Sequence, residues 1–168
     1  KQNILNGWRA GGPPPFGYML EKVELGKHRT GDTITKTRLV PNPETCDIAR
    51  EIFERRAKLE SRRAIIDDFY RQGIPSPKGF DRWAVSTLKS MEDNVDAYLG
   101  HSVFFRHNER IKTRGKTDGF VGGKKWRPKE EWVKTENTHE PLILPEIANR
   151  ICEIKKRGLR DAPYNRKV

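Results

Sequence analysis

The sequence predicts an α+β domain that is mainly helical, with a helix-turn-helix-like core, a β-hairpin and short strands. Three observations lead to this prediction. Apolar residues recur at helical spacing in four segments, two runs near the N-terminus alternate as strands do, and Gly and Pro clusters separate these elements. At 168 residues, of which 34% are hydrophobic and 34% charged, the chain can bury one modest core.

The first element after the N-terminus is expected to be a hairpin. Residues 1–16 end in Gly11-Gly12-Pro13-Pro14-Pro15, which cannot continue a helix and predicts an extended linker. Two β-like runs follow at residues 16–23 and 33–40, and the turn-rich residues 25–32 lie between them. This order predicts an antiparallel pair.

Two helices are predicted next. Asn42-Pro43-Glu44 has the composition of a helix start, with Asn as N-cap, Pro at the first position and an acid in the first turn. The apolar stripe of this helix is Ile48, Ala49, Ile52, Phe53 and Ala57. The second helix begins at Ser61 and stops at Gly73. Its buried face is expected to be Ile65, Ile66, Phe69 and Tyr70.

A third helix is predicted over residues 82–92, after a connection that Pro75 and Pro77 hold open. Val85, Leu88 and Met91 are expected to face inward. Two helices joined by a short loop suggest a helix-turn-helix unit, whose second helix exposes polar side chains to DNA bases. The candidate DNA-binding residues on this helix are Arg82, Ser86, Thr87, Lys89 and Ser90. The alternative is a solvated helix face in a three-helix core.

Short strands are predicted at residues 103–105 and 132–135, with a long basic loop, residues 106–130, between them. A final helix is expected to begin near Pro145 and to bury Ile147, Ile151 and Ile154. No internal repeat is visible.

The net charge of +11 favours a polyanionic partner, which is nucleic acid first and an acidic membrane second. Membrane binding is disfavoured because no apolar run approaches about 18 residues and no basic amphipathic helix carries large apolar anchors. Residues 101–135 hold ten Lys or Arg against four acids, so this segment carries +6 of the total. Such a loop can follow DNA phosphates, although it can also be a solvated loop. Its candidate contacts are Arg106, Arg110, Lys112, Arg114, Lys116, Lys124, Lys125 and Arg127.

Signs of enzyme chemistry are weak. Residues 136–140 combine carboxylate, amide and imidazole groups, which would suit a metal-dependent nuclease. Asn137 and His139 are better explained as satisfying backbone groups of a turn. Cys46 and Cys152 are expected to be reduced thiols, because they stand far apart. We therefore predict no catalytic residue, no metal and no cofactor in this chain.

Several motifs follow one another along the chain. Gly11 to Tyr18 has the form GG-x-PP-[FY]-GY, and Leu39 to Glu44, followed by Ile52-Phe53, is similar to LVPDPEE…IF. Both motifs resemble segments of the recombinase domain of the large serine recombinases. Further matches are the GIPSPKG run at residues 73–79, Trp83, Ser86-Thr87, Asn94…Tyr98-Leu99-Gly100 and the THEPLI run at residues 138–143. Ala84 departs from the Ser or Thr usual there, and Val95 from a common Pro.

The resemblance implies a DNA-binding module of a phage integrase or mobile-element transposase that acts in the cytoplasm on chromosomal DNA. It implies a catalytic domain with a nucleophilic serine before Lys1, and a zinc ribbon after the linker at residues 159–168. The parent would form dimers and tetramers through those other domains, and residues 17–158 would read a half-site. The N-terminal linker would cross the duplex along the minor groove, with Arg9, Gly11 and Gly12 approaching the DNA. The runner-up functions are a helix-turn-helix transcription regulator and, in the enzyme class, a metal-dependent nuclease.

Overall fold

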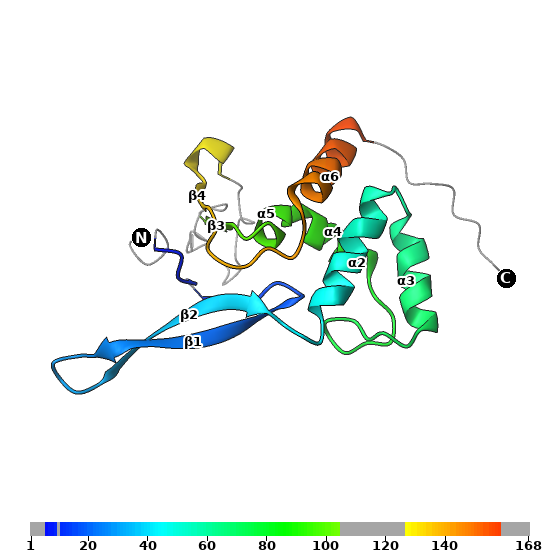
Figure 1. Cartoon of the computed structure of the whole chain (residues 1–168). Helices are drawn as coiled ribbons and strands as arrows, with labels where there is room; N and C mark the ends of the chain where they lie inside the picture. The colour runs from blue at the N-terminus through cyan, green and yellow to red at the C-terminus, as the bar shows by residue number, and fades with distance from the viewer. Residues whose placement is uncertain (1–5, 10, 105–126, 159–168) are drawn as a thin grey trace, which may run out of the picture.

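A computed structural model describes residues 6–9, 11–104 and 127–158, and confirms the α+β fold with helices predominating. A β-hairpin projects from a group of helices, and a second small sheet lies above the hairpin in this view (Figure 1). The elements are β1 (Tyr18–Lys27), β2 (Thr33–Pro41), α2 (Cys46–Ala57), α3 (Arg62–Arg71), α4 (Val85–Asp93), α5 (Val95–Tyr98), β3 (Ser102–Phe104), the 3₁₀ turn η1 (Lys129–Glu131), β4 (Val133–Thr135) and α6 (Pro145–Arg157).

The predicted hairpin is present, and its strands are antiparallel with Glu21 opposite Arg38. The first strand begins at Tyr18, two residues later than predicted, because the backbone turns just before it and the Tyr18 N–H donates to the Pro15 carbonyl at 3.0 Å. The register shifts between Glu24 and Gly26, which leaves Leu25 in a bulge. The tip is a tight turn in which the His28 N–H donates to the Asp32 carbonyl at 2.7 Å.

The start of α2 was predicted too early. The Asn42 side chain accepts from the Glu44 N–H at 3.0 Å, and the Asn42 carbonyl accepts from the N–H groups of Thr45 and Cys46. Asn42 therefore caps a turn that precedes the helix, and Thr45, at φ −129° and ψ −10°, is the residue before its first turn. The predicted apolar stripe is confirmed, since Ala49, Ile52 and Phe53 are fully buried.

The second helix is confirmed as α3, and the Ser61 hydroxyl accepts from the Ala64 N–H at 3.1 Å as an N-cap. Ile65, Ile66 and Phe69 are buried, but Tyr70 is 53% exposed. The prediction that Tyr70 faces the core is therefore wrong. Its ring instead lies beside the Arg82 guanidinium, whose Cζ atom is 5.6 Å from the ring centroid.

The third helix begins at Val85 and not at residue 82, and residues 72–84 separate it from α3. The cause is Trp83, whose buried indole donates its N–H to the Ile74 carbonyl at 3.1 Å and packs edge-on against Phe69. Ala84, which follows it, is in extended backbone at φ −90° and ψ 140°. Leu88 and Met91 face inward as predicted, whereas Val85 is 44% exposed. This first-turn residue lies before the part of α4 that meets the core.

The remaining elements agree with the prediction. Strands β3 and β4 pair antiparallel with Val103 opposite Lys134, and α6 begins at Pro145. Ile151 and Ile154 of α6 are buried, and Ile147 is partly buried against the core. The short helix α5 was not predicted. Cys46 and Cys152 are both free thiols.

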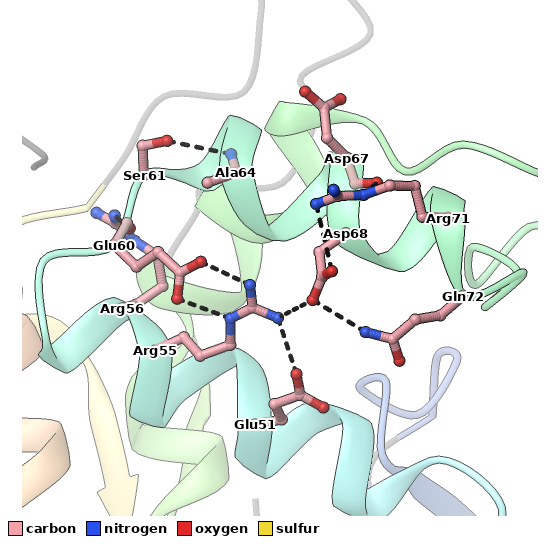
Figure 2. Close-up of polar contacts among 10 residues, drawn as sticks. All are labelled: Glu51, Arg55, Arg56, Glu60, Ser61, Ala64, Asp67, Asp68, Arg71 and Gln72. Carbon is pink, nitrogen blue, oxygen red and sulfur yellow. Dashed lines mark hydrogen bonds and ion pairs between the residues drawn. The ribbon is translucent and has the colours of Figure 1, made fainter. Parts of the chain in front are cut away.

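Two ion-pair clusters hold the helices together. At the surface, the Arg55 guanidinium on α2 donates to Glu51, Glu60 and Asp68, and so joins α2 to α3 (Figure 2). In the core, the Glu92 carboxylate of α4 is 2% exposed and accepts from Arg56 of α2 at 2.8 Å and from Arg62 of α3 at 2.6 Å. The position of α4 is therefore fixed by charge as well as by apolar packing.

Replacing Glu92 by Gln should lower the free energy of unfolding by about 3–5 kcal/mol, because two guanidinium groups lose their carboxylate and Arg56 cannot reach water. Glu21→Gln is the matched control, since Glu21 pairs with Arg38 where both side chains are about half exposed. That change should cost under about 1 kcal/mol. Urea unfolding of both variants measures the difference, and equal costs would contradict the role given to Glu92.

Candidate nucleic-acid interface

A groove of about 710 Å³ lies where the N-terminal segment, α4 and the second sheet meet. Its walls come from segments that are far apart in the chain. The described residues that line it are Arg9, Pro13, Pro14, Pro15, Leu39, Ser86, Lys89, Ser90, Asp93, Asn94, Ala97, His101, Ser102, Val103, Phe104 and His139. The groove thus brings three of the five residues predicted on the third helix together with Arg9 from the linker.

The outer face of α4 forms one wall. Ser86, Lys89 and Ser90 are exposed, and Thr87 is half-buried on the flank. Among the residues that the structure describes, Lys89 has no ion-pair partner. The acid on this wall, Asp93, is neutralised by Lys155 of α6 at 2.5 Å. The wall therefore offers one positive charge and two hydroxyl groups to the groove.

The opposite wall is formed by Arg9 and by the prolines of the Gly-Pro segment (residues 11–15), whereas Gly11 and Gly12 of that segment are not among the lining residues. The Arg9 N–H donates to the Thr37 carbonyl of β2 at 2.8 Å, and its guanidinium donates to the Pro13 carbonyl at 2.8 Å. The Nε atom of Arg9 is buried and has no partner within the described part of the chain. Burial lowers the pKa of Arg9, although an arginine stays charged in proteins. A charged donor without an acid partner at this wall suits an anion.

Gly11 and Gly12 have φ angles of +104° and +80°, which favour glycine. A Cβ atom on either would meet nothing within 4 Å in the described structure. The space beside them is open, so the backbone of the Gly-Pro segment is accessible to a large ligand.

One junction beneath the groove joins these walls. The Tyr18 hydroxyl of β1 donates to the Glu140 carbonyl at 2.9 Å, and the Tyr18 ring packs edge-on against His139 with centroids 4.9 Å apart. The Thr138 N–H donates to the Gly100 carbonyl at 2.8 Å. Gly100 has φ +83°, and a Cβ there would lie 2.5 Å from the His139 carbonyl oxygen, so only glycine fits. Three of the sequence motifs therefore meet at one place.

His139 is a structural member of this junction. Its Nε2 atom lies 2.7 Å from the Ala97 carbonyl oxygen. Because that oxygen only accepts, Nε2 carries a hydrogen and donates it. The Nδ1 atom lies 2.8 Å from the Thr138 hydroxyl. The backbone N–H of Asn137, a residue with φ +52°, donates to His101 at 3.3 Å. Burial is the main cause that lowers the pKa of His139, and the charge of Arg9 adds to it. The ring nitrogens of His139 are thus engaged by Ala97 of α5 and by Thr138 of the turn.

Other predicted contacts lie elsewhere. Arg82 precedes α4, outside the groove lining, and forms an ion pair with Asp67 of α3. Arg127 pairs with Glu131 at 3.5 Å. The other predicted loop contacts lie outside the described residues: Arg106, Arg110, Lys112, Arg114, Lys116, Lys124 and Lys125.

Sequence reasoning missed His101, Ser102 and Asn94, which also line the groove. A signal was available for two of them, because Asn94 is the first residue of the Asn94…Tyr98-Leu99-Gly100 motif and His101 follows its last residue. Their position in the groove depends on β3 folding back beside α4, which no local pattern shows.

Comparison with protein families gives a match. A family model described as Recombinase matches residues 43–158, which is more than half of the chain. No curated protein matches the chain. Within the described residues no helix is long and apolar enough to cross a membrane.

The junction predicts a loss of stability in acid. Because the folded protein holds the pKa of His139 below the ordinary value of 6.5, the unfolded chain takes up a proton that the folded chain refuses. Stability should therefore be full above about pH 7 and fall as the pH drops below 6.5. In His139→Gln this part of the pH dependence should be absent, whereas His28→Gln at the exposed hairpin tip should retain it. Urea unfolding at pH 5 and pH 7.5 gives the comparison, and identical slopes in all three proteins would disprove it.

Proposed function

The chain belongs to the recombinase family, and from that premise we propose that it binds duplex DNA as the recognition module of a site-specific recombinase of the serine type. The DNA would lie across the groove between α4 and the Gly-Pro segment. The observation that carries this proposal is the convergence of Lys89, Arg9 and the α4 hydroxyl groups in one groove, where Asp93, the acid among the described lining residues, is paired with Lys155.

The size of the groove suggests how a duplex would sit. At about 710 Å³ it takes part of one DNA strand and not a whole duplex. The outer face of α4 would then read base edges, where Lys suits guanine and Ser suits either base or phosphate. Arg9 on the opposite wall would hold a phosphate, and the open backbone at Gly11 and Gly12 would pass close to the DNA. The basic loop at residues 106–130 would add phosphate contacts.

Arg82 has a different role in this proposal from Lys89. Its guanidinium is already paired with Asp67 and lies against the face of Tyr70, so a contact with the DNA backbone would compete with those interactions. Lys89 gives up no partner of this kind. In this proposal Lys89, Ser86 and Ser90 contact DNA bases, whereas Arg82 contacts the DNA backbone outside the groove.

Lys89→Ala should weaken binding to a selected half-site by about 1–3 kcal/mol and reduce its discrimination against arbitrary duplex. Arg82→Ala should cost less. Lys58→Ala is the matched control, because it removes one positive charge from an exposed site outside the groove. The half-site is obtained by selection from randomised duplexes, and binding is followed by fluorescence anisotropy over a salt series. Loss of affinity equal to that of Lys58→Ala would refute the assignment of α4 as the reading surface.

We further propose that this chain supplies recognition and leaves strand cleavage and subunit assembly to other domains of the recombinase. A serine nucleophile needs an activating base and cations around the scissile phosphate. Ser61 caps α3, Ser76 accepts from the Phe80 N–H, and Ser102 lies 2.8 Å from the Thr138 hydroxyl. These serines have structural partners, which supports a non-catalytic role for them.

Purified chain incubated with supercoiled plasmid carrying the selected site should give no nick and no covalent protein–DNA band, with or without Mg²⁺. Among the described residues, no serine hydroxyl forms a hydrogen bond with a carboxylate, imidazole or amine, so no covalent step is expected. Denaturing gels detect both products. Either product, if abolished by a serine substitution in this chain, would overturn the recognition-only proposal.

A further inference from the structure

The β1–β2 hairpin extends well beyond the helices, and its outer half stands free of the other described elements (Figure 1). Every residue from Glu24 to Thr33 is exposed. The hairpin lies outside residues 43–158, to which the family model applies. Its function is therefore not accounted for by the match.

The hairpin continues one wall of the groove. Leu39 lines the groove, and in the antiparallel register it lies opposite Leu20, while the next pair on that face is Lys22 opposite Thr37. The Arg9 N–H donates to the Thr37 carbonyl. The wall that faces α4 therefore runs beside β2, and the hairpin extends that wall. A duplex across the groove can thus extend along the hairpin.

The hairpin also carries unpaired positive charge. Lys22, Lys27 and Arg29 are exposed, and none has an acid partner among the described residues. Of the three hairpin acids, Glu21 is held by Arg38 at 2.5 Å and Asp32 accepts from the Thr30 hydroxyl at 3.1 Å. A hydroxyl group does not neutralise a carboxylate, so Asp32 and Glu24, both exposed, keep their negative charges. The three cations outnumber these two acids, so the outer hairpin attracts an anion.

We propose that Lys22, Lys27 and Arg29 bind backbone phosphates of the duplex that flanks the half-site held in the groove. The proposal rests on the proposed function. At about 3.4 Å per residue, ten residues of β1 reach roughly 30 Å, which is close to one turn of DNA. Because phosphates carry no sequence information, this contact should not depend on the flanking sequence.

The test compares two duplexes, a minimal half-site and the same half-site extended on both sides by about ten base pairs of random sequence, one helical turn. The wild-type chain should bind the extended duplex more tightly. The triple variant Lys22→Ala, Lys27→Ala, Arg29→Ala should lose that gain and bind the minimal duplex as the wild type does. Its salt slope on the extended duplex should fall by up to about 2.7, or 0.9 per phosphate.

The matched control is Lys58→Ala, Arg63→Ala, Lys156→Ala, which removes the same charge from exposed residues outside both the hairpin and the groove. It should keep the gain on the extended duplex. Circular dichroism and thermal unfolding of both triple variants show whether each is folded. As a second probe, Arg29→Glu should penalise the extended duplex alone.

The outcomes separate this proposal from the one on which it rests. If the hairpin variant still binds the extended duplex more tightly than the minimal one, as the wild type does, the hairpin proposal is overturned. The Lys89→Ala result then still tests whether DNA binds in the groove. If Lys89→Ala leaves binding of the minimal duplex unchanged, the groove proposal fails whatever the hairpin does. Sedimentation without DNA adds a third outcome. Self-association that the hairpin variant abolishes, with the duplex-length gain unchanged, would assign the surface to a second copy of the chain and overturn the inference.

Discussion

Tyr18 is the residue on which the candidate interface depends. Its ring packs between Tyr98 and His139, and its hydroxyl donates to the carbonyl of Glu140 across 122 positions of sequence. This one side chain ties the base of the hairpin to the short helix after α4 and to the turn before α6. Gly100 allows these segments to approach, since no side chain fits beside the His139 carbonyl. Without this junction, the walls of the groove would have no fixed separation.

The distribution of charge complements that junction. Carboxylates on the helices are held by arginines, as in the Arg55 cluster between α2 and α3 and in the buried pairing of Glu92 with Arg56 and Arg62. Acids of the helical core are thereby neutralised inside the fold. The cations Lys89 and Arg9, at the groove, are left to meet an external anion. Part of the net charge of +11 is therefore presented at the groove by cations that have no acid partner among the described residues.

The elements that sequence patterns predicted well are those fixed by local chemistry. The Ser61 cap, the Pro145 start and the alternating strands all depend on neighbours within a few residues. The start of α4 was predicted wrongly because the Trp83 side chain belongs to the core, and Ala84, between Trp83 and the helix, is in extended backbone. In the candidate site, Lys89 and Ser86 could be predicted from the helix face. Their proximity to Arg9 and Ser102 could not, because it depends on the tertiary junction at Tyr18.

The account is tested most directly by mapping which amides respond when duplex DNA binds. Chemical-shift perturbation by NMR, with the isotopically labelled chain titrated with half-site DNA, gives this map residue by residue. The account predicts the largest changes along Ser86, Lys89 and Ser90, at Arg9 and Gly12, and at Ser102 to Phe104, with the α2–α3 surface around Arg55 unchanged. Changes centred on that α2–α3 surface, with the groove residues silent, would contradict it.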